Sequence, residues 1–101
     1  MPKITLPLPD LAQGQASIVT AGEKRLLVCR SALGIRVMDE ICPHQDKSLE
    51  GGKVRQGTIM CPHHGARFSL EDGRSMAPAL TTKPIILIPC SVNGDMLEID
   101  L

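Results

Sequence analysis

Two short stretches of the chain carry almost the same sequence: Cys42-Pro43-His44 and Cys61-Pro62-His63-His64-Gly65. They contain all three histidines and two of the four cysteines of this 101-residue chain. Thiolate sulfur and imidazole nitrogen are soft to borderline ligands, which suit zinc, copper and iron–sulfur centres. The repetition is too short to be a structural repeat, so we expect two loops that do matching work. We call them the first box and the second box.

The sequence on either side of the boxes is typical of short β-strands, and no amphipathic helical period extends over about 11 residues. Apolar or alternating runs favour strands at residues 16–20, 26–30, 35–39, 58–60, 67–69, 85–88 and 96–101. The turn residues 31–34 predict a hairpin over about residues 25–39, and Asn93-Gly94 is a favoured two-residue hairpin turn. We therefore expect one all-β domain over residues 1–101, with a loop-rich insert at about 41–79.

Composition excludes several classes of function. The chain has 11 Lys plus Arg and 11 Asp plus Glu, so a polybasic arm that binds nucleic acid is excluded as its main functional feature. It has no Trp, no Tyr and a single Phe, Phe68, which excludes aromatic platforms that stack bases or sugars. The most apolar uncharged run, residues 84–94, is too short to span a membrane, and the proline-rich N-terminus does not fit a signal peptide. We expect a cytoplasmic protein that binds neither nucleic acid nor membrane.

Each box offers one sulfur and one nitrogen, whereas the usual Cys2His2 zinc site pairs Cys with Cys and His with His. In an extended segment, residues i and i+2 lie roughly 6–7 Å apart on one side, so Cys42 and His44 could bind two different metal ions. A binuclear cluster in which two cysteines bind one iron and two histidines bind the other needs that division. The residues alone leave a structural zinc module open as an alternative, and they do not choose between His63 and His64.

Residues 42–73 resemble the cluster-binding motif of Rieske [2Fe–2S] proteins. The resemblance is carried by the two boxes, by Leu49, Gly52, Phe68 and Gly73 at the expected offsets, and by Ala77-Pro78-Ala79, which looks like the family's proline loop. It implies a Rieske-type antiparallel β sandwich with a loop-rich cluster-binding subdomain, and one [2Fe–2S] cluster as the cofactor.

The same resemblance implies the ligand set. Cys42 and Cys61 would bind one iron, and His44 and His64 would bind the other, with His63 as a neighbour on the surface. The residues implied to surround the cluster are Pro43, Pro62, Gly65, Phe68 and Pro78.

Departures from the family pattern indicate a low potential. Rieske proteins of respiratory complexes carry two further cysteines that form a disulfide, and here Lys47 and His63 occupy those positions. Those proteins also place a Ser and a Tyr hydroxyl against the cluster sulfurs, where this chain has Ala66 and Phe68. Hydrogen bonds to sulfur stabilise added negative charge, so their absence lowers the potential. We expect a midpoint in the low part of the Rieske range, roughly −150 mV.

The domain resembles the small ferredoxins of bacterial aromatic-ring-hydroxylating dioxygenase systems. Such a ferredoxin is an electron-transfer component and not an enzyme: it passes single electrons from an NAD(P)H-dependent flavoprotein reductase to a terminal oxygenase. The resemblance therefore implies these two partners, and we expect a monomer. A Rieske-fold small subunit of an assimilatory nitrite reductase is the alternative within the family. Cys29 and Cys90 lie in apolar runs outside the boxes, and we expect them to be buried small residues.

Overall fold

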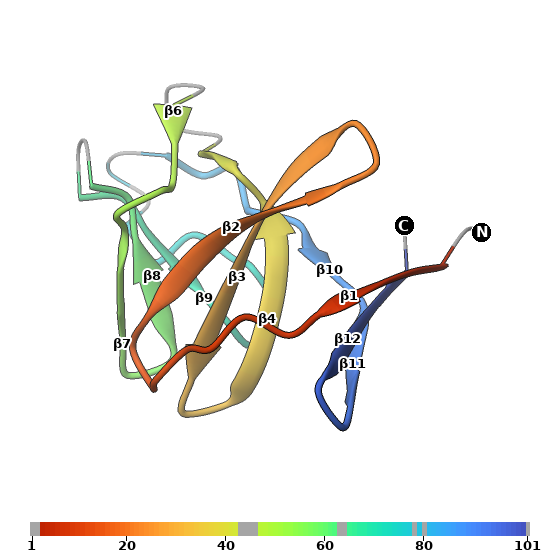
Figure 1. The fold of residues 1–101 in the computed structure, drawn as a ribbon. Helices are drawn as coiled ribbons and strands as arrows, with labels where there is room; N and C mark the ends of the chain where they lie inside the picture. The colour runs from red at the N-terminus through yellow and green to blue at the C-terminus, as the bar shows by residue number, and fades with distance from the viewer. Residues whose placement is uncertain (1–2, 43–46, 63–64, 78, 80, 101) are drawn as a thin grey trace.

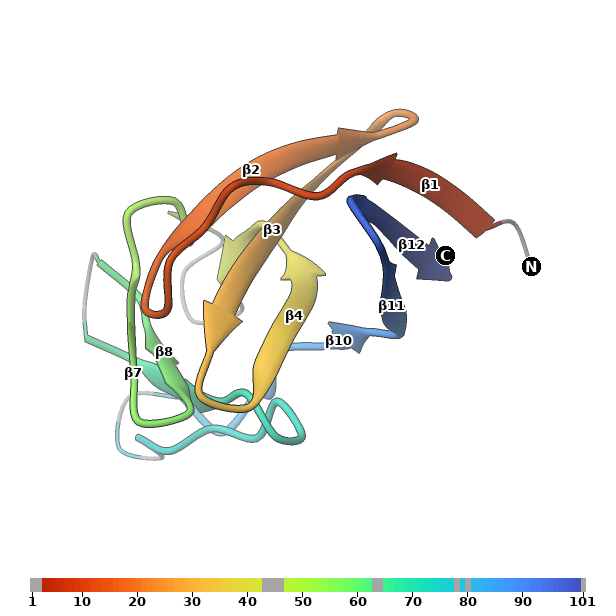
Figure 2. The same cartoon turned by 60° about the horizontal axis from the view of Figure 1, so that its bottom comes forward.

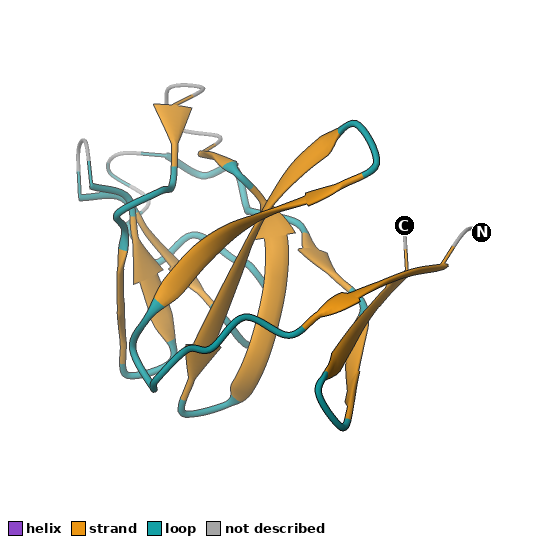
Figure 3. Ribbon diagram, viewed as in Figure 1, coloured by secondary structure: helices purple, strands orange, loops and turns teal. Residues whose placement is uncertain are grey.

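The computed structural model describes residues 3–42, 47–62, 65–77, 79 and 81–100. Within these residues the chain forms twelve strands and no helix (Figure 3). The strands are β1 (Lys3–Pro7), β2 (Ala16–Ala21), β3 (Lys24–Ser31), β4 (Gly34–Asp39), β5 (Ile41–Cys42), β6 (Lys47–Ser48), β7 (Lys53–Arg55), β8 (Thr58–Met60), β9 (Arg67–Ser69), β10 (Leu87–Ile88), β11 (Cys90–Asn93) and β12 (Met96–Asp100). The prediction of an all-β fold is confirmed. No helix in the described part of the chain is long and apolar enough to cross a membrane.

The strands form antiparallel sheets in the orders β1–β12–β11, β10–β4–β3–β2, β5–β6 and β7–β8–β9. The four-stranded sheet stands between the two three-stranded sheets, as Figures 1 and 2 show from two directions. The predicted hairpin at residues 25–39 is present, because β3 and β4 pair from Leu26 opposite Asp39 to Ser31 opposite Gly34.

Strand β3 is buried on both faces because a sheet covers it on each side. Leu27 and Cys29 pack in one cluster with residues of the β7–β8–β9 sheet, and Leu26 and Val28 pack in the other with residues of β12. This position explains why the run from Leu26 to Cys29 is continuously apolar, since side chains of successive strand residues point to opposite faces. The sandwich has two aliphatic cores.

The C-terminal hairpin differs from the sequence prediction by one residue. Asn93 pairs with Met96, so the turn consists of Gly94 and Asp95 rather than Asn93 and Gly94. Gly94 has φ +63°, which suits a glycine at the first central position of a two-residue hairpin turn. The predicted strand at 85–88 is also shorter than expected, because only β10, Leu87–Ile88, pairs with β4.

Strand β1 was not expected from the sequence. Its alternating half-buried residues Ile4 and Leu6 pack on the second core, and Lys3–Pro7 pairs with Met96–Asp100. Pro7 closes the strand at the edge of the sheet, a position that sheets tolerate because an edge proline leaves no ladder donor missing. The prolines of the N-terminus concealed this edge strand in the sequence.

Candidate metal centre

The first box forms the loop of a short hairpin. Ile41 pairs with Ser48 and Cys42 pairs with Lys47, so residues 43–46 connect β5 to β6. Cys42 is thus the last paired residue before the loop. Two of the residues expected here, Pro43 and His44, lie outside the described residues.

The second box lies between β8 and β9. Met60 pairs with Arg67, and the next residue inward, Cys61, donates its backbone N–H to the carbonyl of Ala66 at 2.7 Å. The carbonyl of Cys61 then accepts a bond of 3.1 Å from the N–H of Gly65. Cys61 therefore lies at the base of the β8–β9 hairpin, as Cys42 lies at the base of the β5–β6 hairpin. Both cysteines occupy the same place, at the base of a hairpin loop.

A glycine brings the two hairpins together. Gly52 follows the first hairpin and lies one residue before Lys53, which pairs with Met60. A Cβ atom at Gly52 would lie 2.8 Å from the carbonyl oxygen of Met60 and 2.9 Å from that of Leu49, so only glycine fits. The end of the first hairpin therefore runs directly against the residue that precedes Cys61.

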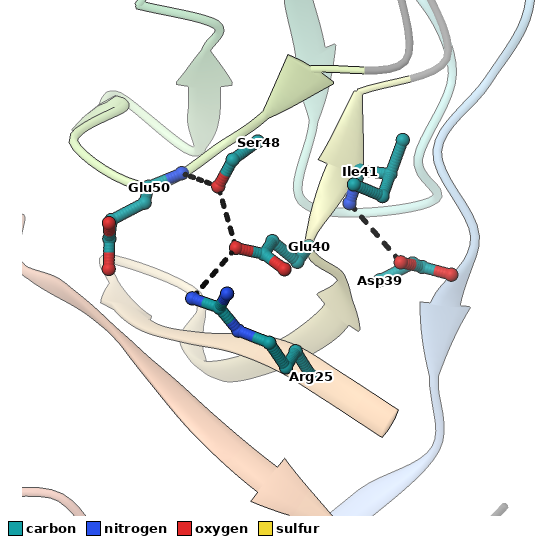
Figure 4. A network of polar contacts seen from close by, with 6 residues as sticks. All are labelled: Arg25, Asp39, Glu40, Ile41, Ser48 and Glu50. Carbon is teal, nitrogen blue, oxygen red and sulfur yellow. Dashed lines mark hydrogen bonds and ion pairs between the residues drawn. The ribbon is translucent and has the colours of Figure 1, made fainter. Parts of the chain in front are cut away.

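A polar network fixes the base of the first hairpin (Figure 4). Ser48 donates its hydroxyl to Oε2 of Glu40 at 2.8 Å, and Arg25 on β3 approaches the same carboxylate at 3.1 Å. The backbone N–H of Leu49 donates to the carbonyl of Glu40 at 2.7 Å, and that of Glu50 donates to the Ser48 hydroxyl at 3.0 Å. Glu40 is 7% exposed, so its carboxylate is one of the few buried polar groups among the described residues, and it has one partner on β3 and one on β6. The role of Glu40 was not predicted from the sequence, where its signal is an acidic residue two positions before Cys42.

A third segment is attached to the second hairpin. Met76 donates its N–H to the carbonyl of Arg67 on β9 at 2.7 Å, and the Ser75 hydroxyl donates to the carbonyl of Thr81 at 2.6 Å. These bonds hold the ends of the predicted proline loop beside β9. Pro78 itself lies outside the described residues.

At the second box, Cys61 packs on the core, whereas Gly65 borders open space. Cys61 is 2% exposed and packs in one cluster with Ala66 and Phe68, both fully buried. Pro62 is exposed. Gly65 has φ +76°, a conformation that favours glycine, and no described atom lies within 4 Å of the position that a Cβ would take. Both His63 and His64 lie outside the described residues, so their expected roles remain predictions.

This arrangement fits a bound iron–sulfur group. Cys61 is a free thiol at the base of the β8–β9 hairpin, and the backbone puts Cys42 at the base of the β5–β6 hairpin. Soft sulfur ligands that enter from two adjacent hairpins suit a cluster or a zinc ion. The described residues contain no group of three or more metal-ligating side chains, and all histidines lie outside them.

The other two cysteines are unsuited to metal binding. Cys29 is fully buried in the middle of β3, and burial raises the pKa of its thiol to about 11, partly offset by Arg36. Burial also raises the pKa of Cys90 at the start of β11. The thiolate is the form that binds metals, so thiols held neutral are poor ligands. Both are free thiols; Cys29 is buried as predicted, whereas Cys90 is only partly buried.

Comparison with known proteins identifies the family. The model of the Rieske [2Fe–2S] domain matches residues 3–89. The chain belongs to this family. The predicted Rieske fold is thereby confirmed, and Rieske membership implies an iron–sulfur cofactor.

Two Rieske relatives are ferredoxin components of oxygenase systems. The alkene monooxygenase ferredoxin component of Xanthobacter autotrophicus is 35% identical over 71 residues, which cover 69% of this chain and 58% of that protein. The biphenyl 2,3-dioxygenase ferredoxin component of Rhodococcus jostii is 28% identical over 93 residues, which cover 91% of this chain and 85% of that protein. The chain thus spans little more than half the length of the first relative and most of the second. Both relatives agree with the prediction of an electron-transfer component rather than an enzyme.

Solved Rieske structures share the fold across nearly the whole chain. The ferredoxin of Sphingomonas yanoikuyae B1 is 25% identical with a TM-score of 0.83, covering 96% of this chain and 98% of that one. The structure of a carbazole 1,9a-dioxygenase complex of reduced oxygenase and oxidised ferredoxin has a chain with a TM-score of 0.84 at 22% identity, covering 96% of this chain and 100% of that one. A nitrite reductase small subunit from Mycobacterium tuberculosis, described there as putative and NADH-dependent, has a TM-score of 0.77 at 17% identity, covering 96% and 92%. These last two likenesses establish the fold alone.

Proposed function

We propose that this chain is a one-electron carrier that takes electrons from an NAD(P)H-dependent flavoprotein reductase and delivers them to the terminal oxygenase of an aromatic-ring-hydroxylating dioxygenase system. The observation that carries the proposal is the pair of matched hairpin loops, each opened by a cysteine of a Cys-Pro-His box. The ferredoxin component of biphenyl 2,3-dioxygenase supports the choice of system, because this chain covers 85% of its length.

The proposed ligands are Cys42 and Cys61 for one iron of a single [2Fe–2S] cluster, and His44 and His64 for the other. When bound, the cluster supplies a one-electron couple whose potential is raised above that of four-cysteine clusters by the neutral imidazoles. The protein contributes rigidity: the Glu40 network fixes the first hairpin, and the packing of Cys61 on Phe68 fixes the second. Loops held in this way limit the structural change that accompanies electron transfer.

The described part of the chain forms a scaffold for the two box hairpins. The described residues provide two stacked aliphatic cores and the box hairpins, and the groove beside Ile41 and Ile85 is open to solvent and lined by apolar residues with Lys24 and Asp39 at its rim. Two relatives are ferredoxin components of oxygenase systems. We therefore assign catalysis to the oxygenase partner, and we place the carrier, as a monomer, in the cytoplasm.

The alternative within the family is a small subunit of a nitrite reductase, which the fold of the M. tuberculosis chain favours at a lower TM-score than the ferredoxins. A structural zinc module is the alternative outside redox chemistry. The three functions predict different metal contents or different partner proteins for the purified chain, so one series of measurements separates them.

The test begins with metal and sulfide analysis of the purified protein. We expect two irons and two acid-labile sulfides per chain, and an electron paramagnetic resonance spectrum of the reduced protein with an average g value below that of the free electron. One zinc without sulfide would contradict the redox function. The chain is then combined with a flavoprotein reductase and the terminal oxygenase of an aromatic-ring-hydroxylating system, and NAD(P)H-driven hydroxylation of an aromatic substrate should require the chain. Activity with a nitrite reductase catalytic subunit instead would favour the alternative.

A further inference from the structure

The outer face of the β7–β8–β9 sheet carries a cluster of cations. Val54, Ile59 and Phe68 point inward to the core, so the alternate residues of these strands point outward. They line an open groove of about 310 Å³ formed by Lys53, Arg55, Gln56, Thr58, Met60 and Arg67. No Asp or Glu lines this groove. We call it the cationic face.

The three cations of this face have no acidic partner in the described part of the chain. The ion pairs there are Lys3 with Asp100, Arg25 with Glu40, and Arg74 with Asp72. The side chains of Lys53, Arg55 and Arg67 are exposed and take part in none of the side-chain hydrogen bonds between described residues. A chain with a net charge of zero has therefore concentrated unneutralised positive charge on one small sheet.

The cationic face lies directly beside the second box. Lys53, Met60 and Arg67 form one row across the three strands. The next row along the strands, toward the second box, contains Gly52, Cys61 and Ala66. Adjacent residues of a strand are about 3.3 Å apart, and the two outer strands are roughly 10 Å apart. A partner that approaches Cys61 from this side thus meets partly exposed Met60 with a cation on either side of it.

We propose that the cationic face is a docking surface for an electron-transfer partner whose own redox centre is surrounded by carboxylates. The proposal rests on the carrier function proposed above. Charges around an electron-transfer site raise the rate of encounter with an oppositely charged surface by about 10-fold or more at low salt. The row with Met60 at its centre provides apolar contact, and the exposed cations provide orientation. Nucleic acid is the less suitable ligand, because the face is one small sheet without aromatic side chains.

A simpler role for the cations is to protect the sheet edges, since Lys and Arg on edge strands prevent edge-to-edge aggregation. That role predicts a change in solubility when the cations are removed and no change in electron-transfer rate. The experiment below separates the two roles.

The first measurement uses small charged oxidants on the reduced holoprotein in a stopped-flow instrument. Hexacyanoferrate(III) accepts one electron from the reduced protein and becomes hexacyanoferrate(II); hexaammineruthenium(III) likewise becomes ruthenium(II). Lys53→Gln/Arg67→Gln should lower the rate with the anionic oxidant about 10-fold at low ionic strength. It should raise the rate with the cationic oxidant, and both effects should vanish near 1 M salt.

The matched control also removes two cations. Lys3→Gln/Lys24→Gln changes the net charge equally, but Lys3 lies on β1 and Lys24 at the β2–β3 hairpin, away from the β7–β8–β9 sheet (Figure 1). We expect the control to change the anionic rate by less than about twofold. Equal effects of the two double variants, or no effect of either, would overturn the proposal.

The second measurement does not depend on the cluster. Hexaglutamate is titrated into ¹⁵N-labelled protein, and amide shifts should occur at Arg55, Gln56 and Thr58 and be lost in the Lys53→Gln/Arg67→Gln variant. Shifts centred elsewhere, or tighter binding of a DNA oligonucleotide, would contradict an acidic protein partner. A protein without a reducible cluster would refute the carrier function, while this titration would still decide the docking surface.

Discussion

The hydroxyl of Ser48 donates a 2.8 Å hydrogen bond to Oε2 of Glu40, and this bond joins the two ends of the hairpin that carries the first box. Arg25 approaches the same carboxylate from β3, so the hairpin is tied to the central sheet (Figure 4). The network holds the backbone of Cys42 in place without any contact from Glu40 to the metal site in the described residues. Glu40 is therefore a positioning residue.

Replacing Glu40 should loosen the first hairpin. Glu40→Ala leaves the Ser48 hydroxyl and Arg25 without their acceptor, which should lower the free energy of unfolding by about 1–3 kcal/mol, with Arg25 contributing little because it is mostly exposed. Glu40→Gln keeps an acceptor for Ser48 and should cost less. Urea unfolding measures the free energy of unfolding, and the rate of cluster bleaching measures how firmly the first hairpin is held.

Asp100→Ala serves as the control for Glu40→Ala, since the ion pair of Asp100 with Lys3 is exposed at both ends and its loss should cost under about 0.5 kcal/mol. Equal bleaching rates in all three variants would contradict the positioning role.

Two adjacent glycines should respond differently to substitution by alanine. The Cβ of Gly52→Ala would strike the carbonyls of Met60 and Leu49, which are backbone atoms, so the two hairpins must separate. Gly51 has φ +84° with nothing within 4 Å of its Cβ position, so Gly51→Ala strains only its own turn, by about 1–2 kcal/mol. We expect iron content per chain to fall sharply in Gly52→Ala and to stay unchanged in Gly51→Ala. Iron analysis of the two purified variants decides the matter, and full iron content in Gly52→Ala would be the contrary result.

The boxes were predictable because metal chemistry restricts residue types within a few positions. Cys42 and Cys61 share a local sequence, and the structure gives them the same place at the base of a loop. The partners of Glu40 could not be predicted in this way, because Arg25 and Ser48 reach it only through the pairing of distant strands. Gly52 was noted for its place in the family pattern, but its physical reason is the close approach of β8, which is a tertiary contact.

The errors in the fold have similar causes. The Asn93-Gly94 dipeptide is a good local turn signal, but the pairing of β11 with β12 moves the turn by one residue. Strand β1 depends on β12 at the far end of the chain for all its pairing, so its own sequence carried only a weak signal. Local chemistry was visible in the sequence, and long-range register was not.

The choice between the adjacent histidines can be tested directly. The resemblance to the Rieske motif favours His64 as the ligand, so His64→Ala should abolish the electron paramagnetic resonance signal of the reduced protein and lower its iron content. His63→Ala should leave both unchanged, and each variant is the control for the other. Loss of the signal in His63→Ala alone would mean that the assignment is wrong.

The thiol of Cys29 should be inert over a wide pH range. Its burial raises its pKa to about 11, so below that pH it stays a neutral thiol, and the reactive thiolate forms only as the pH rises through about 11. Cys90 is partly exposed, so iodoacetamide at pH 8–9 should modify Cys90 and spare Cys29 in the folded protein. Mass spectrometry of the digested product measures both sites. Urea-unfolded protein is the control, in which both should react, and early labelling of Cys29 in the folded protein would contradict the pKa direction.

The low potential expected for this chain should be adjustable at one residue. Ala66 is fully buried beside Cys61 and has no hydroxyl. Ala66→Ser would place a donor at the second box, and a hydrogen bond to a charged acceptor is worth about 1.5–3 kcal/mol. For a one-electron couple this corresponds to a rise of about 60–130 mV in the midpoint, because about 59 mV is a factor of ten. Redox titration followed by optical absorbance gives the midpoint, which we expect at roughly −150 mV in the unchanged protein.

Ser75→Ala, which removes a hydroxyl that donates to the Thr81 carbonyl, is the control for a general loosening of the site and should leave the midpoint within about 20 mV. A midpoint well above zero in the unchanged protein, or no rise in Ala66→Ser, would show that hydroxyl donors do not set the potential here.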